Sequence, residues 1–160
     1  MISKKTNGLV AAGLLAGFIG GIVGSGAKLV GEAIYPPRTQ GQEPPPAVLA
    51  EKIAGHPLSE HQKNVSTQVF HWTTGSAMGA LYGAAAVFAP IVTIGYGVGF
   101  GIVVLLTTHE STLPLLGLDK PPWQQPLREQ TSELATHALY GFAVEFVRRW
   151  LMRRWRPVAG

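Results

Sequence analysis

The chain contains no cysteine, so disulfide bonds, thiol catalysis and thiolate metal sites are excluded. Charged residues are also scarce. They make up 14% of the 160 residues, against about a quarter in soluble domains. Hydrophobic residues account for 46%. A soluble domain of this length would carry more charge on its surface, so the composition indicates a single domain that lies within a membrane.

Four apolar segments are long enough to cross the ~30 Å hydrocarbon core of a bilayer as helices. We expect these spans in a single membrane domain, residues 1–160, at about residues 8–34, 67–89, 91–108 and 134–152. Pro36 and Pro37 follow the first span and end it, because proline lacks the backbone donor that a helix needs. Only Ala89 and Pro90 separate the second and third spans, which predicts a tight antiparallel hairpin. The predicted fold is an all-α integral membrane bundle of four transmembrane helices.

Two long loops, residues 35–65 and 109–130, connect the other spans. In the first loop, residues 47–54 suit a short helix closed by Gly55. Ser59 with Gln62 three residues later resembles a capping box. The second long helix is therefore expected to begin near Ser59, outside the membrane.

Lysine and arginine residues are concentrated beside the two termini. Those near the ends of the spans are Lys4, Lys5, Arg148, Arg149, Arg153, Arg154 and Arg156. By the positive-inside rule, both termini are cytoplasmic and the two long loops are periplasmic, in a bacterial inner membrane. The basic C-terminus is also expected to contact anionic lipid. No basic stripe with stacking aromatic residues is present, so nucleic acid is not an expected partner.

Small residues recur at four-residue spacing, which places them on one face of each predicted helix. The packing residues that we expect are Gly17, Gly21, Gly24, Gly75, Gly79 and Gly83. In the third segment, Gly95, Gly97, Gly99 and Gly101 give two further rows. Lipid provides no hydrophobic drive between helices, and glycine faces are typical of close helix contacts. Such faces also suit self-association with other copies of the chain.

Ionisable residues continue the same helix faces. In the predicted orientation, seven of them lie toward the periplasmic ends of the spans: Lys28, Glu32, His71, His109, Glu110, Glu133 and His137. Lys28 and Glu32 are four residues apart and are expected to form an ion pair. Ionisable groups at membrane depth cost about 2.5 kcal/mol or more each at the bilayer centre, and they mark functional candidates.

This cluster is open to three interpretations. It can be structural, with an ion pair and hydrogen-bonding histidines near the headgroups. It can respond to pH or conduct protons or ions, since histidine titrates at about pH 6.5. It can bind zinc through His71, His109 and His137, because three histidines from three helices suit that ion. We place the pH-responsive function first, a structural or assembly protein acting through glycine contacts second, and zinc binding third.

Catalytic motifs are missing from the sequence. His109-Glu110 lacks the second histidine of a zincin, and there is no phosphate-binding loop and no nucleophile elbow. We therefore expect neither enzyme activity nor a cofactor.

Three stretches together form a recognisable pattern. They are Lys28-x-x-Gly31-Glu32-x-x-x-Pro36-Pro37-Arg38, His109-Glu110 followed by Pro114 and Gly117, and Glu133-x-x-x-His137-x-x-x-Gly141-x-x-x-Glu145-x-x-Arg148-Arg149. This pattern resembles the YagU-like family of small bacterial inner-membrane proteins over nearly the whole chain. The resemblance implies an inner-membrane location and a multi-span helical fold. It implies no reaction and transfers no catalytic residue.

Overall fold

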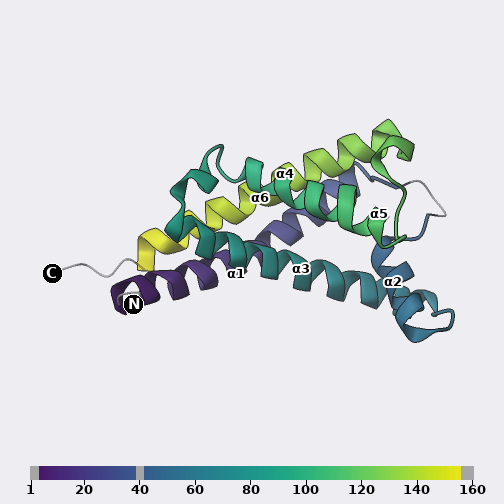
Figure 1. The fold of residues 1–160 in the computed structure, drawn as a ribbon, viewed down its shortest axis with the longest axis horizontal. Helices are drawn as coiled ribbons and strands as arrows, with labels where there is room; N and C mark the ends of the chain where they lie inside the picture. The colour runs from purple at the N-terminus through teal and green to yellow at the C-terminus, as the bar shows by residue number, and fades with distance from the viewer. Residues whose placement is uncertain (1–3, 39–41, 156–160) are drawn as a thin grey trace.

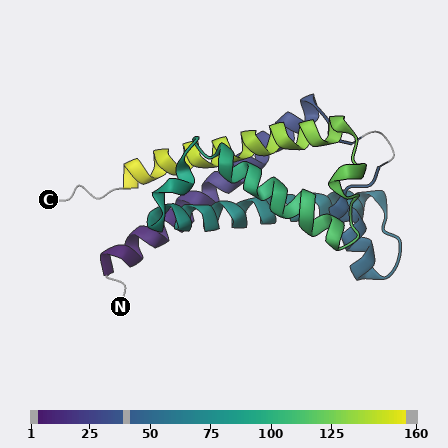
Figure 2. The same cartoon turned by 45° about the horizontal axis from the view of Figure 1, so that its top comes forward.

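The computed structural model describes residues 4–38 and 42–155, which fold into helices with no strand in these ranges. The long helices are α1 (Lys4–Ile34), α3 (Glu60–Phe88), α4 (Val98–Thr107) and α6 (Leu127–Trp155). The short ones are α2 (Pro45–Ala54), α5 (Leu113–Leu115), the 3₁₀ turns η1 (Pro90–Thr93) and η3 (Pro122–Gln124), and the π-helical turn η2 (Thr108–Thr112). The start of α1 and the end of α6 lie at one end of the molecule, and α2 and α5 lie at the other (Figures 1 and 2).

The predicted helix boundaries in the first half of the chain agree with the structure. Ser59 caps α3 with a capping box, in which its side chain accepts a hydrogen bond from the Gln62 N–H and its own N–H donates to the Gln62 side chain. At the end of α2, Gly55 adopts a left-handed conformation with φ of 72°. Such a residue ends a helix without strain only if it has no Cβ, which explains glycine at this position.

The third segment differs from the expected helix over residues 91–108. Pro90–Thr93 form a 3₁₀ turn, and three consecutive residues then have positive φ: Gly95 (73°), Tyr96 (53°) and Gly97 (82°). Left-handed backbone cannot continue a right-handed helix, so α4 begins only at Val98. Gly95 and Gly97 therefore belong to a turn and not to a helical glycine row. The helical chain continues instead through η2 to Leu115.

The expected tight hairpin is also wrong, because the connection between α3 and α4 spans residues 89–97 and the two helices are not a closely packed pair. Instead α3 packs along α1, and α4 packs along α6. Near the connection, the rings of Tyr82 on α3 and Phe100 on α4 stack with centroids 4.2 Å apart.

Glycines allow α1 to approach both α3 and α6 closely. A Cβ on Gly17 would lie 2.1 Å from the Gly79 carbonyl oxygen, and one on Gly21 would lie 2.4 Å from the Gly75 oxygen, so α1 and α3 meet backbone to backbone. A Cβ on Gly24 would lie 2.8 Å from a side-chain carbon of Val144 and 2.9 Å from the Tyr140 ring, so α1 also meets α6 closely. All six of the expected packing glycines, including Gly83, thus lie at contacts within the chain.

Two helical stretches among the described residues are long and apolar enough to cross a membrane, Thr6–Ile34 and Val98–Leu115. The helices α3 and α6 are less apolar along their length. In α3 the first turns are polar because they lie before the predicted span. In α6 the charged residues are buried against the other helices, and Glu129, Glu133 and Glu145 are each at most 4% exposed.

Candidate functional site

A cavity of about 320 Å³ lies among α1, α3, α4 and α6 at the end of the molecule near α2 and α5. Two proline-rich stretches, residues 36–38 and 44–46, also line it. Six of the seven ionisable residues singled out from the sequence line this cavity: Lys28, Glu32, His71, His109, Glu133 and His137. Glu110 lies in η2 and does not line it. The turn of α4 into η2 directs His109 to the cavity and leaves the next side chain outside.

Lys28 connects α1 to α6. Its side chain is 8% exposed, and Nζ contacts both a carboxylate oxygen of Glu32 and, at 3.0 Å, Oε2 of Glu133. The expected pair of Lys28 with Glu32 is therefore present, but it is half of a three-residue network. Glu32 is 24% exposed and Glu133 only 3%, so the buried partner of Lys28 is Glu133.

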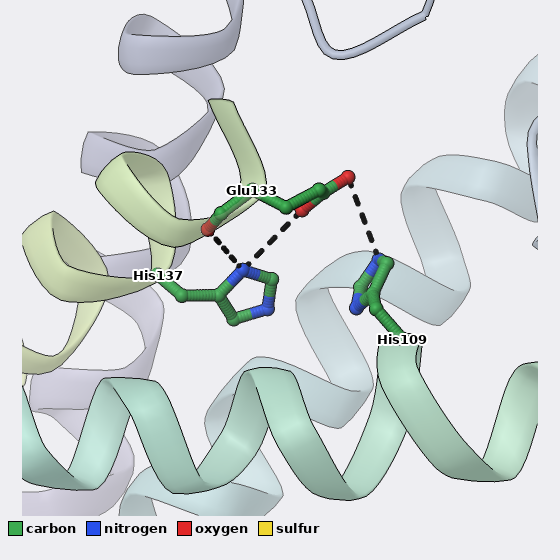
Figure 3. Close-up of side chains that lie close together, drawn as sticks. All are labelled: His109, Glu133 and His137. Atoms are coloured by element: carbon green, nitrogen blue, oxygen red, sulfur yellow. Dashed lines mark hydrogen bonds and ion pairs between the residues drawn. The ribbon is translucent and has the colours of Figure 1, made fainter. Parts of the chain in front are cut away.

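Glu133 lies at the centre of the cluster, with the two imidazole rings on one side of it (Figure 3). Its Oε2 accepts from Lys28 and lies 3.3 Å from Nδ1 of His137. The other oxygen, Oε1, is buried and receives no hydrogen bond. The groups facing it are Nε2 of His109 at 3.7 Å and NH1 of Arg38 at 3.9 Å, both too far for a hydrogen bond.

The hydrogen bonds of the histidines determine which nitrogen carries the proton. In His137, Nδ1–H donates to the Glu133 backbone oxygen at 2.8 Å, which leaves the lone pair on Nε2. In His109, Nδ1 lies 3.0 Å from the Thr108 hydroxyl, and that hydroxyl donates to the Val104 carbonyl oxygen at 2.7 Å. Thr108 therefore accepts from His109 Nδ1–H, and Nε2 of His109 also carries a lone pair.

Neutral His109 thus directs an acceptor, Nε2, toward another acceptor, Glu133 Oε1. One ligand atom from each of His109, Glu133 and His137 lies within 4.8 Å of the others, which is a suitable arrangement for a metal ion. The two rings lie 4.8 Å apart between centroids and meet nearly edge to face, at 73°. Two facing acceptors repel each other unless a cation or a donor lies between them.

The zinc ligands proposed from the sequence need one correction. His71 lines the cavity, but its Nε2 lies 3.1 Å from the Ser25 carbonyl oxygen, and it is not one of the three convergent residues. Glu133 takes its place. The sequence contains a signal for this pair, since Glu133 and His137 are four residues apart on one helix face.

Arg38 is a charged residue of the cavity lining that the sequence did not identify as a site residue. It follows the two prolines after α1, and its NH2 binds Asp119 at 2.8 Å, which ties this stretch to the loop before α6. Weaker contacts reach Glu129 and Glu133, both at 3.9 Å. A lone arginine beside prolines carries no pattern that predicts these partners.

A second polar cluster surrounds Glu145, which is fully buried. Its carboxylate accepts hydrogen bonds from Tyr82 at 2.9 Å, from Arg148 at 2.6 and 2.9 Å, and from Arg149. Every oxygen of this carboxylate has a charged donor, so the cluster is a satisfied structural network. It differs in this respect from Glu133, and it lies in the C-terminal half of α6.

Comparison with known proteins gives one match. The family described as "Protein of unknown function (DUF1440)" matches residues 18–146, which include the ionisable residues that line the cavity, Glu145, and all of the predicted packing glycines except Gly17. No curated protein and no solved structure matches the chain.

Proposed function

Since this chain belongs to the family described as "Protein of unknown function (DUF1440)", whose description names no activity, we propose a function from the geometry of the chain itself. The protein is a multi-pass protein of the bacterial inner membrane that binds a divalent transition metal ion at the outer ends of its helices. Both termini lie in the cytoplasm. The role is binding, as no catalytic motif is present. The resemblance to the YagU-like family agrees with this location and stays a prediction.

The distribution of side chains supports four membrane spans. In a water-soluble protein the apolar side chains are inside, whereas here Glu145, Ser132 and Ser25 are almost fully buried. Large apolar residues on all four long helices are exposed, among them Val30 at 61%, Leu81 at 63%, Val103 at 55% and Phe146 at 63%. A bilayer solvates such a surface and rewards polar groups that pair inside the bundle.

One observation carries the metal site: two lone pairs, on His109 Nε2 and Glu133 Oε1, face each other at 3.7 Å inside the cavity. Nitrogen and oxygen ligands lie about 2.0–2.2 Å from zinc, so two of them in tetrahedral geometry are about 3.4 Å apart. A small inward shift would therefore bring both to one ion.

The surroundings of the three residues suit a metal ligand set. Each histidine donates its Nδ1–H to an oxygen, as metal-binding histidines do, which orients the ring and leaves Nε2 for the ion. Lys28 occupies the other oxygen of Glu133, so Oε1 is the one available. Two imidazoles and one carboxylate are a donor set typical of Zn²⁺.

The test is metal content and affinity of the full-length protein in detergent. We expect about one zinc per chain by elemental analysis, and a loss of affinity of more than about tenfold for His109→Gln or Glu133→Gln. His71→Gln is the matched control, because His71 lines the same cavity outside the trio. Less than stoichiometric zinc after incubation with Zn²⁺, or equal losses in His71→Gln and His109→Gln, would contradict the assignment.

A proton-responsive function is the second candidate, and the same pair of lone pairs favours it. A proton on His109 Nε2 would turn two facing acceptors into a donor and a carboxylate. This function predicts that flux in proteoliposomes responds to pH in the absence of any metal, and that the response is lost when His71, His109 and His137 are all changed to Gln. An unresponsive, zinc-free protein would leave the structural or assembly role.

A further inference from the structure

The cavity extends beyond the proposed metal ligands into an apolar region. Along α6, Tyr140 lies one turn beyond His137 toward the inner end, and along α4, Val104 lies one turn before Thr108. Met78 of α3 lies two turns inside His71. The stacked rings of Tyr82 and Phe100 lie deeper still. The cavity is therefore charged at its outer end and apolar at its inner end.

The side of the cavity between α3 and α4 lacks direct helix packing, because each of these helices packs on a different neighbour. In this wall Phe70 and Thr74 of α3 face the same space as Val104 and Thr108 of α4. Phe70 is 38% exposed. If both helices cross the membrane, a gap between them opens toward lipid chains and not toward water.

A second polar atom in the cavity has no partner. Ser25 lines the cavity and is 1% exposed, and its hydroxyl makes no hydrogen bond. It lies about one turn below Lys28 on α1, near the boundary of the charged and apolar parts. A Cβ on Gly75 would lie 2.0 Å from this hydroxyl, so the hydroxyl packs against the α3 backbone beside the cavity.

We propose that the cavity binds a single-chain anionic amphiphile, a long-chain carboxylate, that enters between α3 and α4. This inference rests on the proposed metal site. Its chain lies along Met78, Val104 and Tyr140, and its carboxylate occupies the fourth position of an ion held by His109, Glu133 and His137. Three protein ligands leave a zinc ion with an open position, which an anionic oxygen fills. The volume of about 320 Å³ suits a small ligand.

The experiment uses the full-length protein loaded with Co²⁺, which accepts the same donor set and reports its ligands in its visible spectrum. Dodecanoate should change the spectrum saturably. Acetate lacks the chain and should act at least about a hundredfold more weakly, since each buried methylene adds to affinity. Dodecanol lacks the charge and should leave the spectrum unchanged.

Val104→Phe should fill the cavity and weaken the dodecanoate response at least about tenfold while metal affinity is retained. Val103→Phe is the matched control, because Val103 is the adjacent residue of α4 and is 55% exposed on the outer surface. Metal binding with no response to dodecanoate, or an equal response to acetate, overturns this inference and leaves the metal site intact. Dodecanoate that binds the metal-free protein equally well overturns the carboxylate–metal contact. Failure of Co²⁺ and Zn²⁺ to bind overturns the proposed function itself.

Discussion

At the scale of single residues, Glu133 is the residue that makes the cavity cluster a candidate binding site, because its two carboxylate oxygens have different environments. Oε2 is neutralised by Lys28, whereas Oε1 has no hydrogen bond. At the other cluster both oxygens of Glu145 are bound by arginines, Oε2 by Arg148 and Oε1 by Arg148 and Arg149. A buried carboxylate with complete partners holds helices together, and one with an open oxygen is available to a ligand.

The buried pair of Lys28 with Glu133 gives the first prediction. Lys28→Met leaves Glu133 charged without its partner, and the free energy of unfolding should fall by about 3–5 kcal/mol. Lys28→Met with Glu133→Gln should recover much of this loss, because no unpaired charge remains. The comparison is Lys28→Met with Glu32→Gln, which should recover little, since Glu32 is 24% exposed. Unfolding is measured in detergent with a chelator present, and equal recovery by both double variants would contradict the assignment of Glu133 as the main partner.

The sequence predicted most members of the outer cluster, because four-residue spacing and helix orientation fix depth and face. It did not predict how they combine. Lys28 reaches Glu133 across 105 positions of the chain, and Arg38 reaches Asp119 across 81. Such pairs depend on the rotation of one helix against another, which local spacing does not determine. Glu110 illustrates this limit, since it directly follows His109 in the chain and yet does not line the cavity.

At the scale of elements, α1 is the helix on which the bundle is assembled. It packs against α3 through one glycine row and against α6 through another, so it carries contacts on two faces. These rows are occupied within the chain. Self-association therefore stays a prediction that requires other surfaces, for which the exposed apolar residues of the outer faces are available.

The glycine row of α1 gives the second prediction. Gly17→Ala should lower the free energy of unfolding by about 1–3 kcal/mol, because the new Cβ would lie 2.1 Å from the Gly79 oxygen and the helices must move apart. Gly8→Ala on the same helix meets nothing within 4 Å. It should be neutral or stabilise by about 0.5–1 kcal/mol through helix propensity. Unfolding in mixed micelles measures both, and equal effects at the two positions would remove the case for the close contact.

The corner between α2 and α3 gives the third prediction, which concerns pH. The Leu58 N–H and then Lys63 lower the pKa of Glu51 from its ordinary value of 4.5. Glu43 and then Glu51 raise the pKa of Lys63 to about 12. A carboxyl group whose pKa is lowered on folding stabilises the fold at pH values above its pKa in the unfolded chain. This stabilisation is lost as the pH falls through the pKa of the folded state. A lysine whose pKa is raised on folding stabilises the fold below pH 10.5, and this stabilisation is lost as the pH rises through about 12.

The corner should therefore be most ordered between about pH 5 and 10. The amide protection factor of Leu58, corrected for intrinsic exchange, should fall below pH 4.5 in the wild type. In Glu51→Gln, protection should be low already at neutral pH and should change little with acid. Glu60→Gln is the control, since Glu60 lies 3.9 Å from Lys63 and is 88% exposed. Constant protection of the Leu58 amide down to about pH 3 would contradict the role of ionised Glu51 in ordering this corner.

The sequence predicted the ends of α1 and α3 because proline and a capping box act locally. It failed at the third segment because hydropathy does not report backbone conformation. The glycines at 95 and 97 have the spacing of a packing row, but their positive φ values place them in a turn. Gly101 does serve in packing, since a Cβ there would lie 1.9 Å from the His137 oxygen. Glycine alone does not distinguish these two uses.

At the scale of the whole molecule, the exposed apolar surface and the buried polar clusters require a common explanation. Of the long helices, α1 and α4 with its continuation are apolar along their length, and α3 and α6 are not. Yet the outward faces of α3 and α6 are as apolar as those of the others, with Leu81 63% and Phe142 45% exposed. Mean hydropathy averages the buried and outward faces of a helix. It therefore underestimates how well a helix can cross a membrane when its charged residues are paired inside the bundle.

The absence of native cysteine makes the four-span arrangement directly testable by single-cysteine labelling in cells. His56→Cys, in the α2–α3 corner, should react with a membrane-impermeant maleimide in intact spheroplasts if, as proposed, that corner lies in the periplasm. Arg153→Cys, near the end of α6, should react only after the membrane is opened. Leu81→Cys and Phe142→Cys should stay unreactive in both conditions, because a thiol in hydrocarbon is not ionised and only the thiolate reacts. Their exposed fractions exclude burial within the protein as the cause, and both should react once the protein is denatured.

Labelling of Leu81→Cys or Phe142→Cys in native membranes would show that α3 or α6 does not cross the bilayer. Reaction of Arg153→Cys in intact spheroplasts would reverse the orientation and place the metal site on the cytoplasmic side.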